Sequence, residues 1–399
     1  MPYPVKWFSS DMPGAPELTS AAGSLISLLD ACLVNGWGLA ALDSLTYDSE
    51  KKIVTGTVAT GHAFADYQVI EISGADQAEF NGTHRIVTRT TTTFTFELAD
   101  PGVAAATGTL SVKIAPAGWL RPFDNGQGTR AVYKPGEGAT TSCVYCIDDT
   151  NTISQWNSNG ANSFIYPAEG ATAVDALGAL FNRHPDESTN WGIIRKANTN
   201  NGAISCKWTL VADDRLVYLY IDFNHGSYTY AKSLYVFGEF ESYVVGDQWN
   251  AMVSSGLTSN QWYYALTELT SFNDPQALVL ARKFDQFGGA TRGSLSGQRG
   301  YQNVMGGSNG YEYPNKADNG LLYAYPAQVQ EHYVNSARSN ALRGWLPGLA
   351  WPLHHRPTTD QARLELPING VTKTHIALNA SHGSAEGQVY IDIDGPWRA

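Results

Sequence analysis

Apolar residues between Pro16 and Asn35 recur at steps of three and four along the chain. They are Leu18, Ala22, Leu25, Ile26, Leu29, Cys32 and Leu33. This spacing predicts an amphipathic helix that begins near Pro16 or Thr19 and ends at Asn35-Gly36, where the left-handed conformation is tolerated. Because one helix does not bury so wide a stripe by itself, we expect either a sheet of this chain or another subunit to cover it.

From about Thr46 to Ala115 the period changes to an alternation of apolar and polar residues. Runs rich in β-branched and aromatic residues predict five strands, at 53–59, 67–73, 83–90, 93–98 and 108–114. Turn residues separate them, with Asn81-Gly82 typical of a hairpin turn and Asp100-Pro101-Gly102 typical of a longer one. The pattern predicts a small antiparallel β module.

The rest of the chain divides into a predicted linker and a larger β-rich region. Residues 116–141 are dense in Gly and Pro, which is typical of a linker. Further strands are predicted at 142–148, 193–197, 204–211, 216–223, 234–240, 362–366, 374–379 and 388–393. Thr172, with Asp175 three residues later, predicts the start of a helix that carries Val174, Leu177 and Phe181 and stops at Pro185.

The predicted fold is therefore mainly β. A helical segment expected to dock into an assembly occupies residues 1–45, a small antiparallel β module residues 46–115, the linker residues 116–141, and an antiparallel β-sandwich-like domain residues 142–399. Residues 288–319 are rich in Gly, Ser and Asn, and a loop of that length is usually functional or held by a partner.

The composition is weakly charged and aromatic. The 399 residues include 26 Lys and Arg, 37 Asp and Glu, 11 Trp, 21 Tyr and 14 Phe, with a formal net charge of −11. Because no cluster of basic residues interrupts this pattern, we expect no nucleic-acid partner. No apolar run approaches the ~20 residues of a membrane helix, and the start shows no signal-peptide pattern, so we expect synthesis in a cytosol without membrane insertion.

Cysteine and serine motifs give little support for catalysis or metal binding. Cys143 and Cys146 are spaced like a zinc or redox pair, but residues three apart on a strand point to opposite faces, so we expect buried thiols. The segment 306–310 matches G-x-S-x-G, yet its polar neighbours lack the strand and helix that a nucleophile elbow needs. We interpret it as a flexible loop.

Acidic and histidine pairs are ambiguous in the same way. Asp148-Asp149 and Asp213-Asp214 favour turns, although two carboxylates across a groove are also the machinery of glycosidases. Asp392-x-Asp394 matches the start of a calcium loop but lacks the distal Glu, so a calcium site is the less favoured interpretation. His354-His355 is interpreted as packing. We expect no catalytic residues, no metal and no cofactor.

Aromatic residues gather between Trp208 and Tyr264, in numbers that exceed what one interior needs. Tyr and Trp are favoured at interfaces, although alternate ones also fill a sandwich. Tyr228 and Tyr230, beside His225-Gly226-Ser227, are the candidates for receptor or ligand contact.

Several segments resemble a family of tail and baseplate virion proteins of tailed bacteriophages and prophages. They are PGAP at 13–16, AGSLISLLDACLVNG at 22–36, GHAF at 61–64, ISGA at 72–75, FNG at 80–82, APAGW at 115–119 and RGWLPGL at 343–349. The resemblance covers residues 5–120 well and later segments in patches. The aromatic and Gly-rich middle departs from it. Because the family it resembles is structural, the resemblance implies no catalytic residue.

The resemblance implies a virion protein of the tail tip or baseplate that is made in the bacterial cytoplasm, contacts other tail subunits and forms a homotrimer. On this hypothesis Leu18, Leu25, Leu29 and Leu33 form an assembly interface. A second hypothesis is a host-adhesion protein whose large domain recognises a surface glycan or a host filament. A third, the least favoured, is a glycan-degrading hydrolase.

Overall fold

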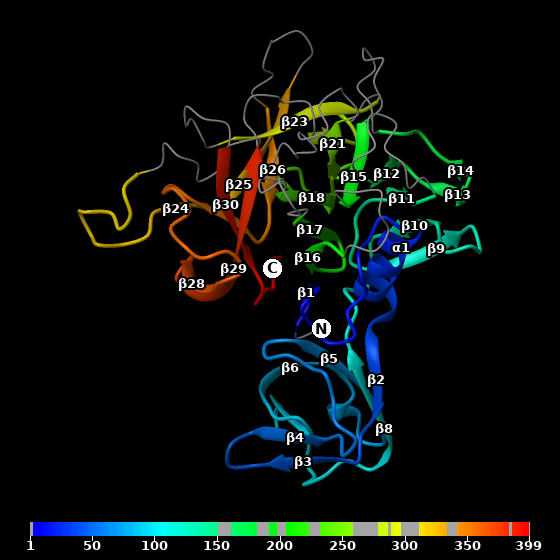
Figure 1. Ribbon diagram of the computed structural model, residues 1–399, viewed down its shortest axis with the longest axis vertical. Coiled ribbons are helices and arrows are strands. Elements are labelled where there is room, and N and C mark those ends of the chain that lie inside the picture. Colours follow the sequence, from blue (N-terminus) through cyan, green and yellow to red (C-terminus); the bar gives the residue numbers. More distant parts are fainter. Residues whose placement is uncertain are drawn as a thin grey trace.

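Antiparallel β-sheets make up most of the structure, as the alternating pattern predicts. The computed structural model describes residues 3–150, 161–181, 191–197, 205–222, 232–257, 278–285, 289–296, 311–332, 341–382 and 385–398. Figure 1 shows a smaller lower part built from residues 37–114 and a larger upper part, with β1 and the C-terminal residues where the two meet.

The lower part is a curled seven-stranded sheet, called the barrel below. Its order is β2-β8-β5-β6-β7-β4-β3. The strands are β2 (Trp37–Ala41), β3 (Ser44–Asp48), β4 (Ile53–Thr57), β5 (Val69–Ala75), β6 (Gly82–Arg89), β7 (Thr93–Glu97) and β8 (Gly108–Ile114). β3 returns to the segment before β8, since Tyr47 N–H donates to Ala104 O and Ala106 N–H donates to Leu45 O. The five predicted strands of this module are confirmed.

The predicted N-terminal helix is shorter than its apolar stripe. α1 spans Ser24–Leu29 and continues as a π-helix over Asp30–Asn35, which ends at Gly36 (φ 70°) as expected. Leu18 lies outside the helix and pairs with Cys206, whose N–H donates to Leu18 O. The start differs because Thr19 and Ser24 hydrogen-bond to each other across a turn, and Gly23 precedes α1 in the left-handed conformation.

A ten-stranded sheet forms the centre of the upper part, in the order β1-β16-β17-β18-β20-β22-β23-β25-β26-β19. Its strands are β1 (Lys6–Ser9), β16 (Lys207–Ala212), β17 (Leu216–Asp222), β18 (Lys232–Glu239), β19 (Glu241–Ser242), β20 (Ala251–Ser254), β22 (Leu278–Leu280), β23 (Thr291–Ser296), β25 (Ala327–His332) and β26 (Leu342–Leu346). β23 lies inside the segment 288–319, which was expected to be a loop throughout.

A second sheet covers one face of this central sheet. It has the order β21-β15-β12-β11-β10-β9, with β9 (Leu120–Asp124), β10 (Arg130–Lys134), β11 (Val144–Asp148), β12 (Ala161–Ala168), β15 (Trp191–Ala197) and β21 (Gly256–Leu257). The prediction of a linker over 116–141 is therefore wrong where β9 and β10 form. These two strands are short and lie among Gly and Pro residues. The predicted helix near Thr172 is also wrong. A hairpin of β13 (Ala171–Ala173) and β14 (Ala176–Leu177) packs there, because Val174 and Leu177 cover the outer face of this sheet.

The third sheet covers the opposite face, in the order β24-β27-β30-β29-β28. It contains β24 (Tyr323–Ala324), β27 (Leu349–Pro352), β28 (Arg363–Ile368), β29 (Val371–His382) and β30 (Ala385–Asp392). Side chains of the central sheet consequently alternate between two buried layers. Val217 and Leu219 pack toward Tyr145, while Tyr218 and Tyr220 pack toward the third sheet. Figure 1 shows β16–β18 between these neighbours.

Candidate functional site

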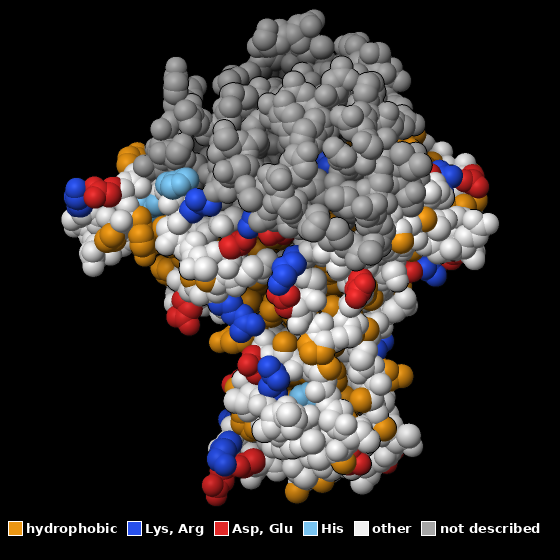
Figure 2. Space-filling model, viewed as in Figure 1, with side chains coloured by type: hydrophobic (Ala, Val, Ile, Leu, Met, Phe, Trp, Pro, Cys, Tyr) orange, Lys and Arg blue, Asp and Glu red, His pale blue; other side chains and the backbone are white. Residues whose placement is uncertain are grey.

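A groove of about 440 Å³ lies where the barrel meets the upper part. Five separate segments of the chain line it, contributing Trp7, Met12, His62, Arg89, Gln361 and Arg363 among others. Trp7 belongs to β1, Arg89 ends β6, and Arg363 begins β28. The groove therefore exists only when the barrel, the first strand and the third sheet are assembled against one another. Figure 2 shows hydrophobic side chains on the surface at this narrow junction.

A second cavity of about 500 Å³ adjoins the first at Pro13 and residues 62–64. Its walls include Gly38 and Leu39 of β2, together with Ile114 of β8. Leu39 is 74% exposed, the second most exposed of the large apolar side chains in the described ranges. We call the two adjoining cavities together the waist groove. The first cavity is its polar half and the second is its apolar half.

Arg363 is stacked between two aromatic rings at the polar half of the waist groove. Its guanidinium carbon lies 5.0 Å from the ring centre of Trp7 and 4.7 Å from that of Tyr67. Its Nη2 donates to the backbone O of Asp66 at 3.3 Å. Burial lowers the pKa of Arg363 from its usual value, and neighbouring Tyr67 and Asp66 counteract this. The side chain is thus a partly desolvated cation, and among the described residues Asp66 O is its one hydrogen-bond acceptor.

Two bulky residues beside Arg363 have strained backbones. Tyr67 has φ 66° and Gln361 has φ 63°, in the left-handed region that bulky side chains rarely adopt. Such strain costs of order 1–3 kcal/mol and persists only where the surrounding structure enforces it, which occurs often at functional sites. This observation marks the polar half of the waist groove as the candidate site.

The polar half has more cationic donors than acceptors. Arg89 Nε lies 3.4 Å from Asp66 Oδ1, while Arg363 contacts the backbone O of the same residue. Asp11 is neutralised by Lys207 at 2.8 Å. Gln361 Oε1 accepts from Thr209, and within the described part of the chain neither its amide N–H groups nor the buried indole N–H of Trp7 have a partner. The balance favours a ligand that brings acceptors and negative charge.

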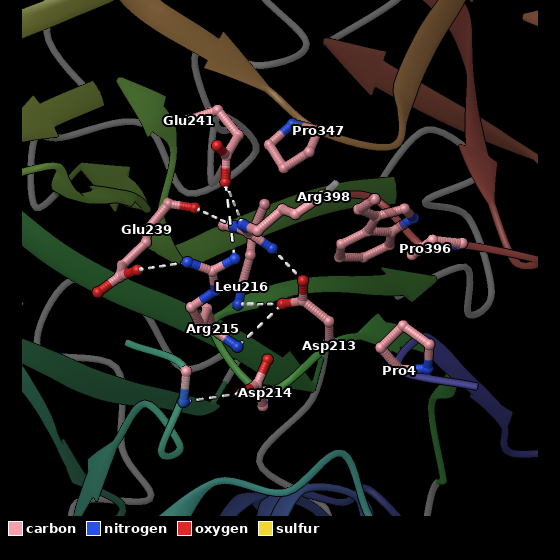
Figure 3. A network of polar contacts seen from close by, with 12 residues as sticks. Pro4, Asp213, Asp214, Arg215, Leu216, Glu239, Glu241, Pro347, Pro396 and Arg398 are labelled. Atoms are coloured by element: carbon pink, nitrogen blue, oxygen red, sulfur yellow. Dashed lines mark hydrogen bonds and ion pairs between the residues drawn. The ribbon is translucent and has the colours of Figure 1, made fainter. Parts of the chain in front are cut away.

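The C-terminal segment 392–398 fastens the junction behind the groove. Arg85 of the barrel binds Asp394 Oδ1 at 2.8 Å and donates to the backbone O of Ile393 and of Asp394. Arg398 binds Asp213 and Glu241 and donates to Glu239 O at 2.6 Å. Figure 3 shows the guanidinium groups of Arg215 and Arg398 between these carboxylates.

Two buried ionisable groups near this segment have shifted pKa values. Burial lowers the pKa of Lys6 to about 8, against the attraction of Asp213 and Asp214. Burial also raises the pKa of Glu239, and the N–H of Thr141 and the charges of Arg215 and Arg398 oppose that rise. Both groups stabilise the junction less than their charges suggest, because desolvation outweighs the attraction.

The residues expected to form an assembly interface are not on the surface. Leu18, Leu25, Leu29 and Leu33 are all fully buried among the side chains of this chain's own barrel and sheets. The expectation of an interface there is wrong. The apolar stripe is covered by sheets of this chain and not by another subunit. Tyr228 and Tyr230 lie outside the described residues.

The aromatic surplus between Trp208 and Tyr264 is largely explained by the central sheet. Tyr218, Tyr220, Tyr235 and Phe237 are fully buried, since sheets cover both faces of their strands. For these four side chains the alternative of core filling holds. Tyr243, on the loop after β19, is 50% exposed.

The cysteine and histidine candidates have structural roles. Cys143 and Cys146 pack in different clusters on opposite faces of the second sheet, as alternation predicts, and burial raises the pKa of Cys143 to about 12. His354 is buried between two backbone groups, since its Nε2 accepts from Leu322 N–H and its Nδ1 lies 3.0 Å from Tyr311 O. The segment 306–310 lies outside the described residues.

The acidic pairs are engaged within the chain. Asp148 Oδ1 accepts from Thr150, and Asp213 Oδ1 accepts from the N–H groups of Arg215 and Leu216, which are the turn contacts expected. Asp392 Oδ1 accepts from the N–H groups of the two residues that follow Ile393. Asp149 differs, because it forms a buried ion pair with Lys196. Across the described ranges, His, Cys, Asp and Glu form no group of three placed to hold a metal ion.

Comparisons with known proteins assign no family to this chain. No protein-family model matches the sequence, and no curated protein matches it. Among the described helices none has the length and apolar character to cross a membrane. Sequence reasoning missed Trp7, Tyr67 and Arg363, because their meeting depends on tertiary contacts and no local motif marks them.

Proposed function

We propose that this chain is a structural subunit of the tail tip or baseplate of a tailed bacteriophage, made in the bacterial cytoplasm and acting by binding neighbouring subunits. The resemblance of residues 5–120 to tail proteins suggests the setting. The waist groove carries the proposal, because it offers unpaired donors beside an exposed apolar edge. Such a surface gains free energy when a partner supplies acceptors and covers apolar area.

Exposed apolar side chains elsewhere also support a function in binding other proteins. Val245 is 100% exposed at the tip of the loop after β19, and Tyr243 and Val244 beside it are about half exposed. Large apolar side chains that project in a group typically mark interaction surfaces.

The proposal is tested on intact particles. Antibody-gold labelling of purified virions is expected to place this chain at the end of the tail, and the mass of the isolated chain by ultracentrifugation is expected to be that of a homotrimer. A stable monomer that is absent from the virion would overturn the proposal.

A second candidate function is host adhesion, in which the large domain binds a surface glycan or a host filament. Arg363 stacked between Trp7 and Tyr67 favours it, since aromatic and guanidinium planes recur in carbohydrate and peptide recognition. Tyr228→Ala or Tyr230→Ala is expected to reduce adsorption to host cells while assembly is unchanged. Unaltered adsorption of both variants would remove these residues from the binding site.

We propose no catalytic role. The carboxylates of Asp148, Asp213 and Asp392 already accept hydrogen bonds from their own turns. Incubation with host polysaccharide tests the hydrolase hypothesis, because a glycosidase releases reducing ends and a binding protein does not.

A further inference from the structure

We infer that the waist groove receives an extended acidic peptide segment of a neighbouring polypeptide, which adds to the free edge of β2 and places a carboxylate between Arg89 and Arg363. This inference rests on the proposed function and names the kind of partner that the same groove takes. Three features of the groove carry it: a free strand edge, an apolar half without charged side chains, and a cationic half.

The strand edge comes first. β2 lies at the end of the barrel sheet and, within the described ranges, pairs with β8 alone. The apolar cavity lies beside Gly38, Leu39 and Ala40 of this strand. An unpaired strand edge offers backbone N–H and C=O groups to an extended peptide, and neighbouring pockets take alternate side chains of that peptide.

The apolar half selects the side chains that accompany such a strand. Its lining includes Pro13, Leu39, Phe64 and Ile114 and contains no Asp, Glu, Lys or Arg. Thr60, His62 and Thr91 are the polar side chains of this lining, so a saccharide placed here would find partners for few of its hydroxyl groups, and each buried hydroxyl without a partner costs about 1–3 kcal/mol. An aliphatic peptide side chain carries no such cost. The apolar half therefore favours a peptide over a glycan.

The cationic half sets the charge of the segment. Arg89 and Arg363 share Asp66, and Asp11 is paired with Lys207, so one positive charge is left over. Gln361, whose amide N–H groups have no partner within the described part of the chain, lies on the same wall. Guanidinium groups bind carboxylates through two parallel N–H donors and by charge attraction, whereas the amide and backbone oxygens of a neutral or basic peptide are uncharged acceptors and bind more weakly. The segment therefore carries Asp or Glu at the end that reaches Arg363.

The probe is a fluorescein-labelled synthetic peptide with alternating Val and Thr followed by two Glu, and its control has Gln in place of both Glu. By fluorescence anisotropy with the full chain, the acidic peptide is expected to bind roughly tenfold more tightly than the Gln control, a difference of about 1.4 kcal/mol. Added salt is expected to narrow that difference. Equal affinity for the two peptides, or no binding of either at about 1 mM, overturns the inference.

Matched variants locate the binding. Arg89→Gln with Arg363→Gln is expected to abolish the preference for Glu, whereas Lys51→Gln with Lys316→Gln, which removes the same charge from exposed sites, is expected to preserve it. Leu39→Glu is expected to weaken the acidic peptide at least tenfold. Leu120→Glu, on the edge strand β9 of the second sheet, is the control and is expected to have no effect. Equal effects of the two Leu variants contradict addition at β2.

Two further experiments distinguish failure of this inference from failure of the proposed function. A hexamer of galacturonate that binds more tightly than the acidic peptide overturns the peptide assignment in favour of an acidic glycan. A chain that is found in virions but binds no peptide retains its proposed function and loses this inference. A chain that binds the acidic peptide but is absent from virions loses the proposed function alone. Thermal unfolding of every variant checks that it is folded.

Discussion

The barrel and the upper part are both antiparallel, but their interiors differ in chemistry. Phe80, Phe94 and Phe96 fill the barrel, and His84 is buried among them with its Nε2 3.0 Å from Phe80 O. The upper part instead buries ion pairs. Lys196 with Asp149 and Arg343 with Glu331 are almost inaccessible, and each pair joins different strands or segments.

The difference follows from how the two parts are built. All barrel strands come from one continuous segment, residues 37–114, and three of the six neighbouring strand pairs join strands that follow one another in sequence. The upper part stacks three sheets from segments far apart in the chain, and buried charged pairs occupy positions where those segments meet. Such pairs specify which segments come together more than they add stability.

The largest expected effect comes from breaking one of these pairs. Asp149→Ala removes the partner of Lys196 and the acceptor of Leu25 N–H at the start of α1. We expect the free energy of unfolding in urea to fall by about 3–5 kcal/mol, because a buried cation is left unpaired. Asp149→Leu combined with Lys196→Met is expected to recover most of the loss. If the single variant costs no more than Asp175→Ala at an exposed site, the role given to this pair is wrong.

Lys6, between the two parts, gives a comparable effect that depends on pH. Because burial lowers its pKa from 10.5 to about 8, the unfolded chain binds more protons between these values, and stability rises with pH across that window. Lys6→Met is expected to be more stable than the original protein by about 3 kcal/mol at pH 7, and the gain is expected to disappear as the pH rises from 8 to 10.5. Lys207→Met, at an exposed site, is the control. A gain that does not change with pH contradicts the assignment.

The smallest effect tests the packing of the barrel. A Cβ on Gly56 of β4 would lie 2.4 Å from Phe94 Cζ, so Gly56→Ala must displace the ring. We expect a loss of about 1–3 kcal/mol in thermal unfolding, as is typical of overpacked cores. Gly56→Ala combined with Phe94→Leu is expected to cost less than the sum of the two single variants, because the smaller side chain relieves the clash. Additive costs would show that the ring and Gly56 do not interact.

The sequence predicts the barrel better than the upper part, because the barrel comes from one continuous segment whereas the upper part stacks sheets from distant segments. β8 spans Gly108–Ile114, as the alternation predicts, because its pattern is local. For Tyr218 and Tyr220 the sequence leaves core filling and surface contact open, because the sheet that buries them, with β29 and β30, lies far downstream. Val174 and Leu177 are spaced for either a helix turn or a hairpin, and only their packing on the second sheet decides between these.

The waist groove was beyond sequence reasoning altogether. Trp7, Tyr67 and Arg363 come from three distant segments, and the left-handed conformation of Tyr67 follows no glycine or asparagine signal. Tyr228 and Tyr230, the aromatic residues that the sequence singles out, lie outside the described residues. Stacking on a guanidinium is a property of the assembled junction, which local patterns do not record.

The bond between Arg85 and Asp394 has a consequence for how the chain is made. The barrel strands leave the ribosome hundreds of residues before their anchor does, and β1 is translated long before its partner β16. A nascent barrel can close on its own hairpins, since they are complete by Ile114. Its orientation and the waist groove are settled only once the segment 392–398 has been made, so binding follows synthesis of that segment.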